Sequence, residues 1–318
     1  MKEYKSCLSN YIHDYLDLKE SLGFSRNTHI YNLHEIDNDL IQKYPELTTL
    51  TEEFTMEWIK KRQSECTNTQ KRRMVTIREL GKYLNAIGVD SFILPSDFIG
   101  KYSRSTPYLF TDEELTKLFF TIDNIKPYFE SPKREYVLPV LFRMMYCCGL
   151  RPAEPLGLQS GDVDLSSGTL FIRNSKGHRD RVIPMSKCLL DLCRKFDSLT
   201  GKRKWFFPYL DTDEPCKGYW VRNQLKICWR NSGLDHGQKH PRPYDFRHNY
   251  ATRIILKWLD EGRSFTSMAP YLREYMGHAD LLSTQYYIHL LPENIIKSSG
   301  IDWTRFNKIY PEATHEEI

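Results

Sequence analysis

The sequence lacks any run of about 20 apolar residues, the length that an α-helix needs to cross a bilayer. It opens with MKEYKSCLSNYIHDYLDLKE, which is charged and amphipathic and lacks the apolar centre of a signal peptide. It also contains no internal repeat and no low-complexity tract. These absences exclude membrane-spanning and repeat architectures, and they predict a globular, cytoplasmic protein without a membrane partner.

Short cysteine pairs are absent too. The eight cysteines include no C-x-x-C pair, so the paired spacing typical of zinc sites is missing. A cytosolic compartment disfavours disulfides, and we therefore expect reduced, mostly buried thiols. The acidic residues do not cluster as a two-metal site would need. The sequence thus predicts no metal and no other cofactor.

A strong net charge is also missing, since 45 Lys and Arg against 41 Asp and Glu leave only +4. The distribution is more informative than the total. Residues 1–59 carry five basic and eleven acidic residues, whereas residues 60–82 carry eight basic and two acidic ones. Such a local basic segment is typical of phosphate neutralisation, although a solvated helix face would give the same count.

The length of 318 residues suggests two domains. The first hundred residues show helical periodicity; in the fourth segment Ile77, Leu80, Leu84 and Ile87 form one apolar face, and Gly88 follows where a helix should end. Residues 89–107 contain Pro and Gly that break the periodicity. We therefore expect a helical domain over 1–103 and a second domain over 104–318.

The second domain is predicted to be mostly helical with a small antiparallel sheet. Thr111 begins a helix, and EYVLPVLFRMMYCCGL reads as a buried helix that ends at Gly149. GTLFIRNSKGHRDRVIPM then alternates as two short strands around a Ser-Lys-Gly-His turn, and helices resume near residue 186.

Four stretches of this domain share an unusual set of side chains: GLRPAEPLGLQSGDVDL, the predicted hairpin, YDFRHNYAT and MGHADLLSTQYYIH. Guanidinium groups match the nonbridging oxygens of a phosphate, a lysine can protonate a leaving alkoxide, and a tyrosine can attack phosphorus. Together they suggest phosphodiester chemistry without a metal. The candidate residues are Arg151, Glu154, Lys176, Tyr244, Arg247, His278 and Tyr287.

Each candidate also has a plain structural alternative when it is considered alone. Arg151 and Glu154 could form a structural ion pair, and Lys176 could be an ordinary exposed hairpin residue. His278 follows a glycine and could cap a helix. Tyr287 could be a core aromatic, since the chain has 20 tyrosines.

In this order, the four stretches resemble the motifs of the tyrosine recombinase (phage integrase) family. GLRPAEPLGL resembles its first-arginine motif and NSKGHRDRVIP its β-hairpin lysine motif. YDFRHNYAT resembles its H-x-x-R motif, and GHADLLSTQYYIH its histidine-to-nucleophile motif. The resemblance covers roughly residues 107–290, and the helices before it are similar to the family's core-binding domain. It implies a site-specific recombinase that cleaves and rejoins DNA, for integration, excision or transposition of a mobile element.

The resemblance also implies a role for each candidate. Arg151 and Arg247 would clamp the scissile phosphate and stabilise its transition-state charge. Lys176 would protonate the leaving 5′ oxygen, and His278 would hydrogen-bond the phosphate. Tyr287 would attack and form a 3′-phosphotyrosyl link, which a 5′ hydroxyl later reverses. Glu154, three residues after the first arginine, would orient that arginine.

Two positions need separate treatment. In the family, the nucleophile lies nine residues after the histidine and two before another histidine, and Tyr287 meets both spacings with His278 and His289. Tyr286 meets neither and is expected to pack. Tyr244 stands where the family usually has histidine, and its reference pKa of about 10 makes it a poor proton acceptor at neutral pH. We expect Tyr244 to keep a hydrogen bond to phosphate; an impaired site is the alternative.

The implied architecture is a two-domain, C-shaped DNA clamp, in which a helical core-binding domain and an α+β catalytic domain cover opposite faces of the duplex. An additional arm-binding domain is not expected. The implied partners are double-stranded DNA with paired recombination sites and further copies of the chain in a homotetramer, with accessory DNA-bending proteins left open. The tail, with Trp303, Phe306 and Tyr310 at helical spacing, is expected to dock on a neighbouring subunit. The expected DNA contacts are Lys71, Arg78, Lys82 and Arg242, with Lys239 a weaker candidate.

Two other functions compete with this interpretation. A type IB topoisomerase would use similar residues as a monomer, and a DNA-binding accessory protein would carry an impaired site. Motif order and chain length favour the recombinase over the first, and only Tyr244 favours the second. The sequence does not specify the target site or the biological role of the reaction.

Overall fold

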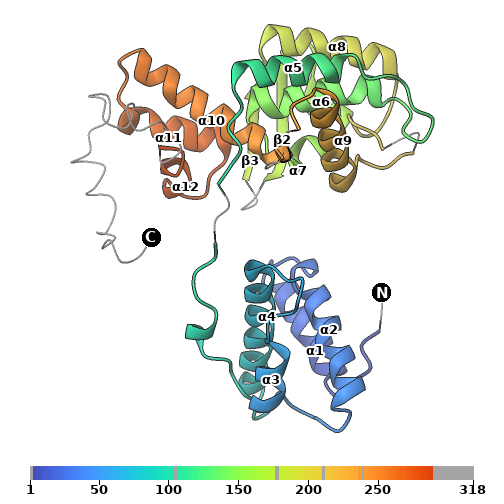
Figure 1. Cartoon of the computed structure of the whole chain (residues 1–318), viewed down its shortest axis with the longest axis vertical. Helices are drawn as coiled ribbons and strands as arrows, with labels where there is room; N and C mark the ends of the chain where they lie inside the picture. The colour runs from blue at the N-terminus through green and yellow to red at the C-terminus, as the bar shows by residue number, and fades with distance from the viewer. Residues whose placement is uncertain are drawn as a thin grey trace. The chain divides into compact units, whose positions relative to one another are not determined.

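The computed structural model describes residues 3–103, 106–175, 179–209, 212–235, 237 and 240–288. The chain divides into two compact units, Met1–Ser105 and Thr106–Ile318 (Figure 1). Within the described residues, no helix has both the length and the apolar character needed to span a bilayer.

Over residues 3–103, the first unit is built from four α-helices and one short 3-10 helix: α1 (Ser9–Ser21), α2 (Asn27–Lys43), α3 (Glu52–Trp58), α4 (Thr67–Ala86) and η1 (Ser96–Phe98). The α3 helix begins where its sequence predicts, because the Thr51 side chain accepts a hydrogen bond from the Phe54 N–H at 3.2 Å. The α4 helix buries Ile77, Leu80 and Leu84 as predicted. Ile87 was expected on the same face but is 45% exposed, because α4 ends at Ala86.

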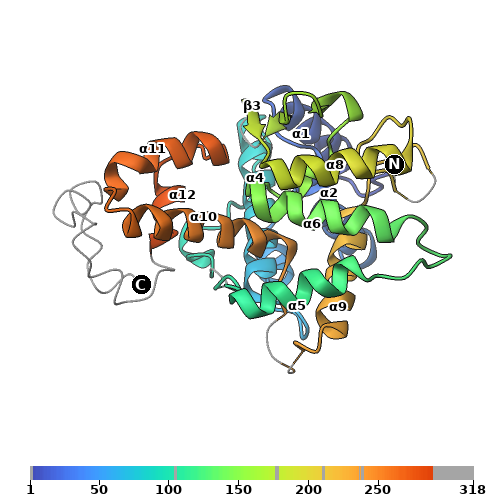
Figure 2. The same cartoon turned by 90° about the horizontal axis from the view of Figure 1, so that it is seen from above.

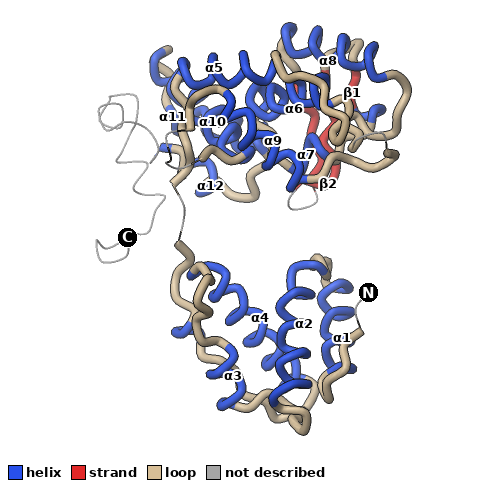
Figure 3. The backbone as a smooth tube through the Cα atoms, turned by 45° about the vertical axis from the view of Figure 1, so that its right-hand side comes forward, coloured by secondary structure: helices blue, strands red, loops and turns tan. Residues whose placement is uncertain are grey.

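The second unit is mostly helical and contains one small sheet (Figure 3). Its elements are α5 (Asp112–Asp123), α6 (Arg134–Cys148), α7 (Ala153–Leu156), η2 (Ser160–Asp162), β1 (Val163–Asp164), β2 (Thr169–Ser175), β3 (Arg179–Pro184), α8 (Lys187–Thr200), α9 (Gly218–Asn231), α10 (Pro243–Asp260), α11 (Phe265–Met276) and α12 (Leu282–Gln285). The predicted start at Thr111 is confirmed by a capping box, in which Thr111 and Glu114 each bond the other's backbone N–H.

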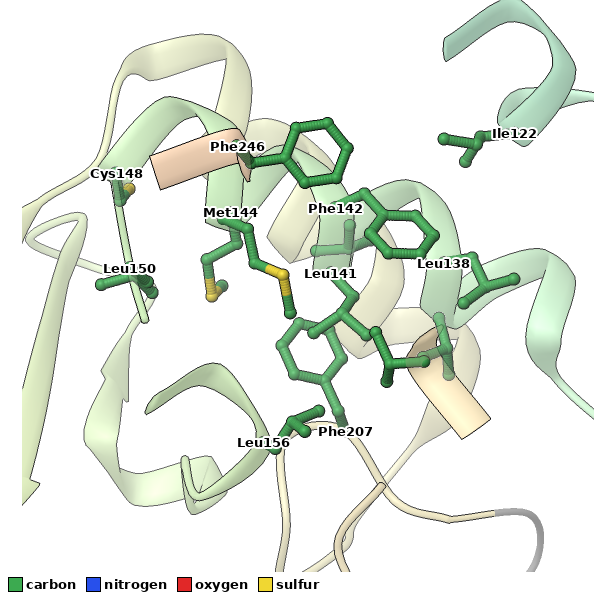
Figure 4. Packing of buried hydrophobic residues seen from close by; sticks show 14 of the residues in the cluster. Ile122, Leu138, Leu141, Phe142, Met144, Cys148, Leu150, Leu156, Phe207 and Phe246 are labelled. Atoms are coloured by element: carbon green, nitrogen blue, oxygen red, sulfur yellow. The ribbon is translucent and has the colours of Figure 1, made fainter. Parts of the chain in front are cut away.

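The centre of this unit is the buried helix α6, which lies between α5 and α8 (Figure 2). Phe142, Leu141 and Met144 of α6 pack near Phe246 of α10 in one apolar cluster (Figure 4). The helix ends at Gly149, as predicted, in a left-handed conformation with φ of +59°. A Cβ atom at this position would overlap the Tyr250 ring of α10, so glycine permits both the turn and the close approach of α10.

The sheet has antiparallel order β1–β2–β3. The predicted hairpin is confirmed in β2 and β3, which pair Leu170 with Ile183 and Ile172 with Arg181. The turn residues 176–178 lie outside the described residues. The strand β1 was not expected, because two residues are too few to show alternation.

The cysteines are free, as expected, but the prediction that most are buried was wrong. Cys148, Cys193, Cys216 and Cys228 are buried, and Cys7, Cys66, Cys147 and Cys188 are exposed. Adjacent residues in a helix point in different directions, so the apolar run that contains both Cys147 and Cys148 buries only one of them.

Candidate active site

The first predicted arginine shares a carboxylate with a second arginine from the sheet. Arg151 follows α6 and donates from its backbone N and from Nη1 to the two oxygens of Glu154 on α7, at 2.8 and 2.9 Å. Arg181 of β3 donates to the same two oxygens at 2.9 and 2.8 Å. Burial raises the pKa of the Glu154 carboxyl, but the Arg181 hydrogen bonds and charge outweigh this effect and lower the pKa to about 2. Glu154 is therefore a carboxylate at neutral pH.

Arg247 is the second predicted arginine and is fully buried in α10. Its Nη1 donates to the Gly149 carbonyl and its Nη2 to the Met276 carbonyl, both at 2.7 Å. Its buried Nε has no hydrogen-bond partner within the described part of the chain. Burial lowers the pKa of this guanidinium. A buried cation with an unsatisfied donor is suited to binding an anion.

His278 and Tyr287 lie against each other, with ring centroids 5.9 Å apart and planes at 20°. The His278 Nδ1 is 2.8 Å from the Thr284 hydroxyl, which fixes the ring. Burial, together with the charges of Arg247 and Arg151, lowers the pKa of His278 to about 3, so this imidazole is neutral at pH 7.

The Tyr287 phenol is 2% exposed, and burial raises its pKa to about 12. The charge of the Arg247 guanidinium acts in the opposite direction and lowers this pKa. Arg247 is therefore close enough to the phenol to stabilise its deprotonated form. Tyr286 is less buried and makes its ring contacts with Tyr287 and His248.

The structure thus brings four predicted residues together from separate segments. Arg151 Nη2 donates to the Gly277 carbonyl at 2.5 Å, directly before His278, and Arg247 bonds the preceding carbonyl, that of Met276. The packing of α10 on α6 and α11 makes this possible, because it places Arg247 next to both the end of α6 and the end of α11. The resulting cluster has guanidinium groups, a neutral imidazole and a phenol side by side.

Tyr244, the departure from the usual motif, lies in the first turn of α10 and is 38% exposed. Its ring centroid is 5.0 Å from that of His248, one helical turn later. The His248 ring in turn lies 5.5 Å from the Tyr287 ring, so Tyr244 reaches the nucleophile through His248. Lys176, Lys239, His289 and the tail residues Trp303, Phe306 and Tyr310 lie outside the described residues.

Sequence reasoning missed two residues of this cluster, Arg181 and His248. The His248 ring lies 5.5 Å from that of Tyr287, its buried Nδ1 has no hydrogen-bond partner in the described chain, and burial lowers its pKa to about 4. A signal was present for each: Arg181 shares the inward face of β3 with Ile183, and His248 is four residues after Tyr244 on one helix.

The predicted DNA-contact residues Lys71, Arg78 and Lys82 lie on α4 at spacings of seven and four, which puts them on one helix face. Lys82 pairs with Glu79 at 2.8 Å, and Lys71 donates to the Lys101 carbonyl. Arg242 is engaged with Asp245 at 3.0 Å as part of the cap of α10.

One member of the basic segment 60–82 does not face solvent at all. Arg73 is 1% exposed, donates to both oxygens of Glu65 and lies over the Trp58 ring. Its charge supports the fold of the first unit, so fewer than eight cations of this segment are available to bind phosphates. Among the described residues, no group of three His, Cys, Asp or Glu side chains could hold a metal ion.

Comparison with known proteins identifies the relatives of this chain. Residues 109–294 match the phage integrase family. An integrase/recombinase of Sinorhizobium fredii is 24% identical over 307 residues, which cover 89% of this chain and 92% of that protein. Tyrosine recombinase XerA of Thermococcus kodakarensis is 29% identical over 201 residues, covering 62% of this chain and 64% of XerA. A crystal structure of XerH site-specific recombinase bound to palindromic difH substrate, a post-cleavage complex, has a TM-score of 0.64 at 19% identity. The match covers 88% of this chain and 80% of that chain and shows the same fold.

Proposed function

Since the chain belongs to the phage integrase family, we propose that it is a site-specific DNA recombinase whose nucleophile is Tyr287. The observation that carries this proposal is the position of the Tyr287 phenol, which lies against neutral His278 and within the influence of the buried Arg247 guanidinium. A tyrosine next to fixed cations is suited to attack phosphorus, because the same cations stabilise the charge that the phosphate gains.

The proposed step begins with the scissile phosphate between Arg151 and Arg247. The Tyr287 oxygen attacks phosphorus, the bond from phosphorus to the 5′ oxygen breaks, and a 3′-phosphotyrosyl link forms. With a pKa of about 12, the phenol holds its proton at neutral pH, so this proton passes to solvent water as the new bond forms. We propose that Lys176 protonates the departing 5′ oxygen. The 5′ hydroxyl of another strand then reverses the attack, and the retained ester makes ATP unnecessary.

The remaining groups have supporting roles in this proposal. Glu154 fixes Arg151 through two hydrogen bonds, one to its backbone and one to its guanidinium. His278 is neutral and can donate a hydrogen bond to a phosphate oxygen. Tyr244 lies at the edge of the cluster, 38% exposed, and can donate to the same phosphate.

In the proposed assembly both units contact the duplex. The first unit would contact backbone phosphates through the α4 face that carries Lys71, Arg78 and Lys82, and the second would supply the active site. We further propose that four copies act on two DNA sites in the cytoplasm, with the tail of each copy docked on its neighbour. The reaction would serve integration, excision or transposition of a mobile element. The XerH relative was crystallised on its difH substrate, in agreement with a duplex DNA partner here.

A covalent trapping experiment tests the proposed function. The wild-type chain is incubated with nicked suicide duplexes that carry a randomised central sequence, so that the cleaved short strand diffuses away and the adduct accumulates. Denaturing gels should show an adduct for the wild type and for Tyr286→Phe, the matched control, but none for Tyr287→Phe. Sequencing the trapped DNA gives the preferred site. No adduct from a folded, DNA-bound wild type would contradict the proposal.

Tyr244 favours a second candidate, a DNA-binding accessory protein with an impaired site. That protein would bind the same duplexes and form no adduct. If adducts form, recombination between two copies of the recovered site separates the recombinase from a topoisomerase, which would relax supercoils without exchanging strands.

A further inference from the structure

Arg181 is a largely buried cation in a strand, where a residue of this kind needs a specific partner. Its side chain is 10% exposed, whereas Val182 beside it is 58% exposed and Ile183 is fully buried. Arg181 therefore lies on the inward face of β3. None of the roles proposed above uses it.

The Arg181 guanidinium donates from each of its three nitrogens to two other elements. Nη1 and Nη2 bond the two oxygens of Glu154 on α7, and Nε donates to the Tyr275 carbonyl in α11 at 2.9 Å. A planar fork of this kind fixes both the distance and the orientation of the carboxylate. Arg181 thus connects the sheet to α7 and to the end of α11.

The same two elements, α7 and the end of α11, also hold Arg151. The Glu154 carboxylate accepts from the Arg151 backbone and guanidinium, and the turn after α11 accepts from Arg151 Nη2 through the Gly277 carbonyl. At Gly277 the φ angle is +63°, and an added Cβ would lie 3.1 Å from Arg181 Nη1. Arg181 and Arg151 therefore hold the same carboxylate and the same turn from two sides.

We propose that Arg181 is a positioning residue for phosphate binding, which fixes Glu154 and the turn 275–277 in the places from which they orient Arg151. This inference rests on the proposed function, because it assigns Arg151 to the phosphate. The role assigned to Arg181 runs through its contacts with Glu154 and the Tyr275 carbonyl, and not through the reacting atoms. Without Arg181, Glu154 would lose the two hydrogen bonds that tie it to β3, and the guanidinium of Arg151 would lose a rigid support.

A purely structural role is the competing explanation, since a buried ion pair can simply stabilise the fold. The two explanations differ in how they depend on the charge of the phosphate. Replacing one nonbridging oxygen with methyl gives a neutral methylphosphonate, which needs less neutralisation by a guanidinium. A defect that acts through Arg151 should therefore shrink on this substrate, whereas a defect in the fold should not.

The experiment measures single-turnover cleavage of a suicide duplex with the sequence recovered by trapping, carrying either a phosphodiester or a methylphosphonate at the scissile position. A misplacement of about 1 Å can cost on the order of 100-fold, so Arg181→Gln should slow phosphodiester cleavage at least about tenfold. On the methylphosphonate, Arg181→Gln and Arg151→Gln should both recover most of their lost rate. Arg181→Lys, which keeps the charge without the fork, should fall between wild type and Arg181→Gln.

Arg173 provides the matched control. It lies on the neighbouring strand β2, its side chain is 59% exposed, and it pairs with Asp162 at 2.6 Å. Arg173→Gln should cleave both substrates at close to the wild-type rate. If Arg181→Gln unfolds below the assay temperature, Arg181→Lys decides the comparison.

Equal losses on both substrates would overturn the inference in favour of a structural role, and so would an unchanged phosphodiester rate in Arg181→Gln. Failure of the proposed function would look different, because the wild type itself would then form no Tyr287-dependent adduct, and the inference would fall with it.

Discussion

Replacing Glu154 with glutamine should destabilise the second unit by an amount that depends on pH. In the folded chain the pKa of Glu154 is about 2, against an ordinary value of 4.5. At 1.36 kcal/mol per pH unit, this difference corresponds to about 3 kcal/mol of stability at neutral pH. The side chain is only 7% exposed, so solvent screening removes little of it.

The sign follows from the direction of the shift. A carboxyl whose pKa is lower in the folded state contributes its full stability above 4.5, and this contribution is lost as the pH falls toward 2. Glutamine does not titrate in this range. The difference in unfolding free energy between wild type and Glu154→Gln should therefore shrink by about 1 kcal/mol at pH 4 and by about 2 kcal/mol at pH 3. All other carboxyls titrate in both proteins and largely cancel from the difference.

Urea unfolding at pH 7, 5, 4 and 3, followed by tryptophan fluorescence, measures this difference. The transition of the second unit can be assigned because five of the six tryptophans belong to it: Trp205, Trp220, Trp229, Trp258 and Trp303. Asp123→Asn is the control, because Asp123 also receives a two-pronged arginine contact, from Arg143, but is 44% exposed. Asp123→Asn should lower the free energy of unfolding by less than about 1 kcal/mol. A wild-type to Glu154→Gln difference that stays constant from pH 7 to 3 would refute the idea that the two guanidinium groups hold Glu154 as a carboxylate.

Three further outcomes are expected. Arg247→Lys removes the guanidinium fork that bonds two backbone carbonyls. It should lower the rate of single-turnover cleavage on the order of 100-fold, whereas the affinity for the duplex in gel shifts should change far less. A cleavage rate near that of the wild type would contradict the assigned role. Gly149→Ala should lower the free energy of unfolding, measured by thermal unfolding, by about 1–3 kcal/mol, because φ is +59° and the added Cβ meets the Tyr250 ring. An unchanged melting temperature would show that α10 does not pack so closely on the end of α6. Tyr244→His should change cleavage by less than about tenfold, and a rise on the order of 100-fold, the size of a general-base contribution, would indicate an impaired natural site.

The local features of the fold were predictable because they depend on neighbouring residues. Thr111 with Glu114 marks a helix start, Gly149 marks a helix end, and the alternation in β2 and β3 marks a hairpin. The strand β1 has no such pattern, since its two residues are defined only by their partner strand.

The motifs identified the candidate residues, but they did not predict how these residues are arranged in space. Spacing related His278 to Tyr287, which lie nine residues apart. The approach of Arg247 to Gly149 spans 98 positions and depends on how α10 packs on α6. A sequence pattern contains no direct information about such packing.

Buried cations were the hardest feature to predict. Arg73 was counted in the basic segment, yet it is paired with Glu65 inside the first unit. Arg181 was not singled out, although it is paired with Glu154 beside the active site. In both cases the arginine is paired with a carboxylate from another segment of the chain, and composition alone assigns such arginines to the surface.

Mapping the site of covalent attachment tests the central claim most directly. The trapped wild-type adduct is digested with nuclease and trypsin, and tandem mass spectrometry is applied to the peptide spanning residues 274–297, which contains Tyr286 and Tyr287 and no internal Lys or Arg. The account predicts a nucleotide joined through its 3′ phosphate to the Tyr287 oxygen. A nucleotide on Tyr286, or on any residue outside this peptide, would contradict it.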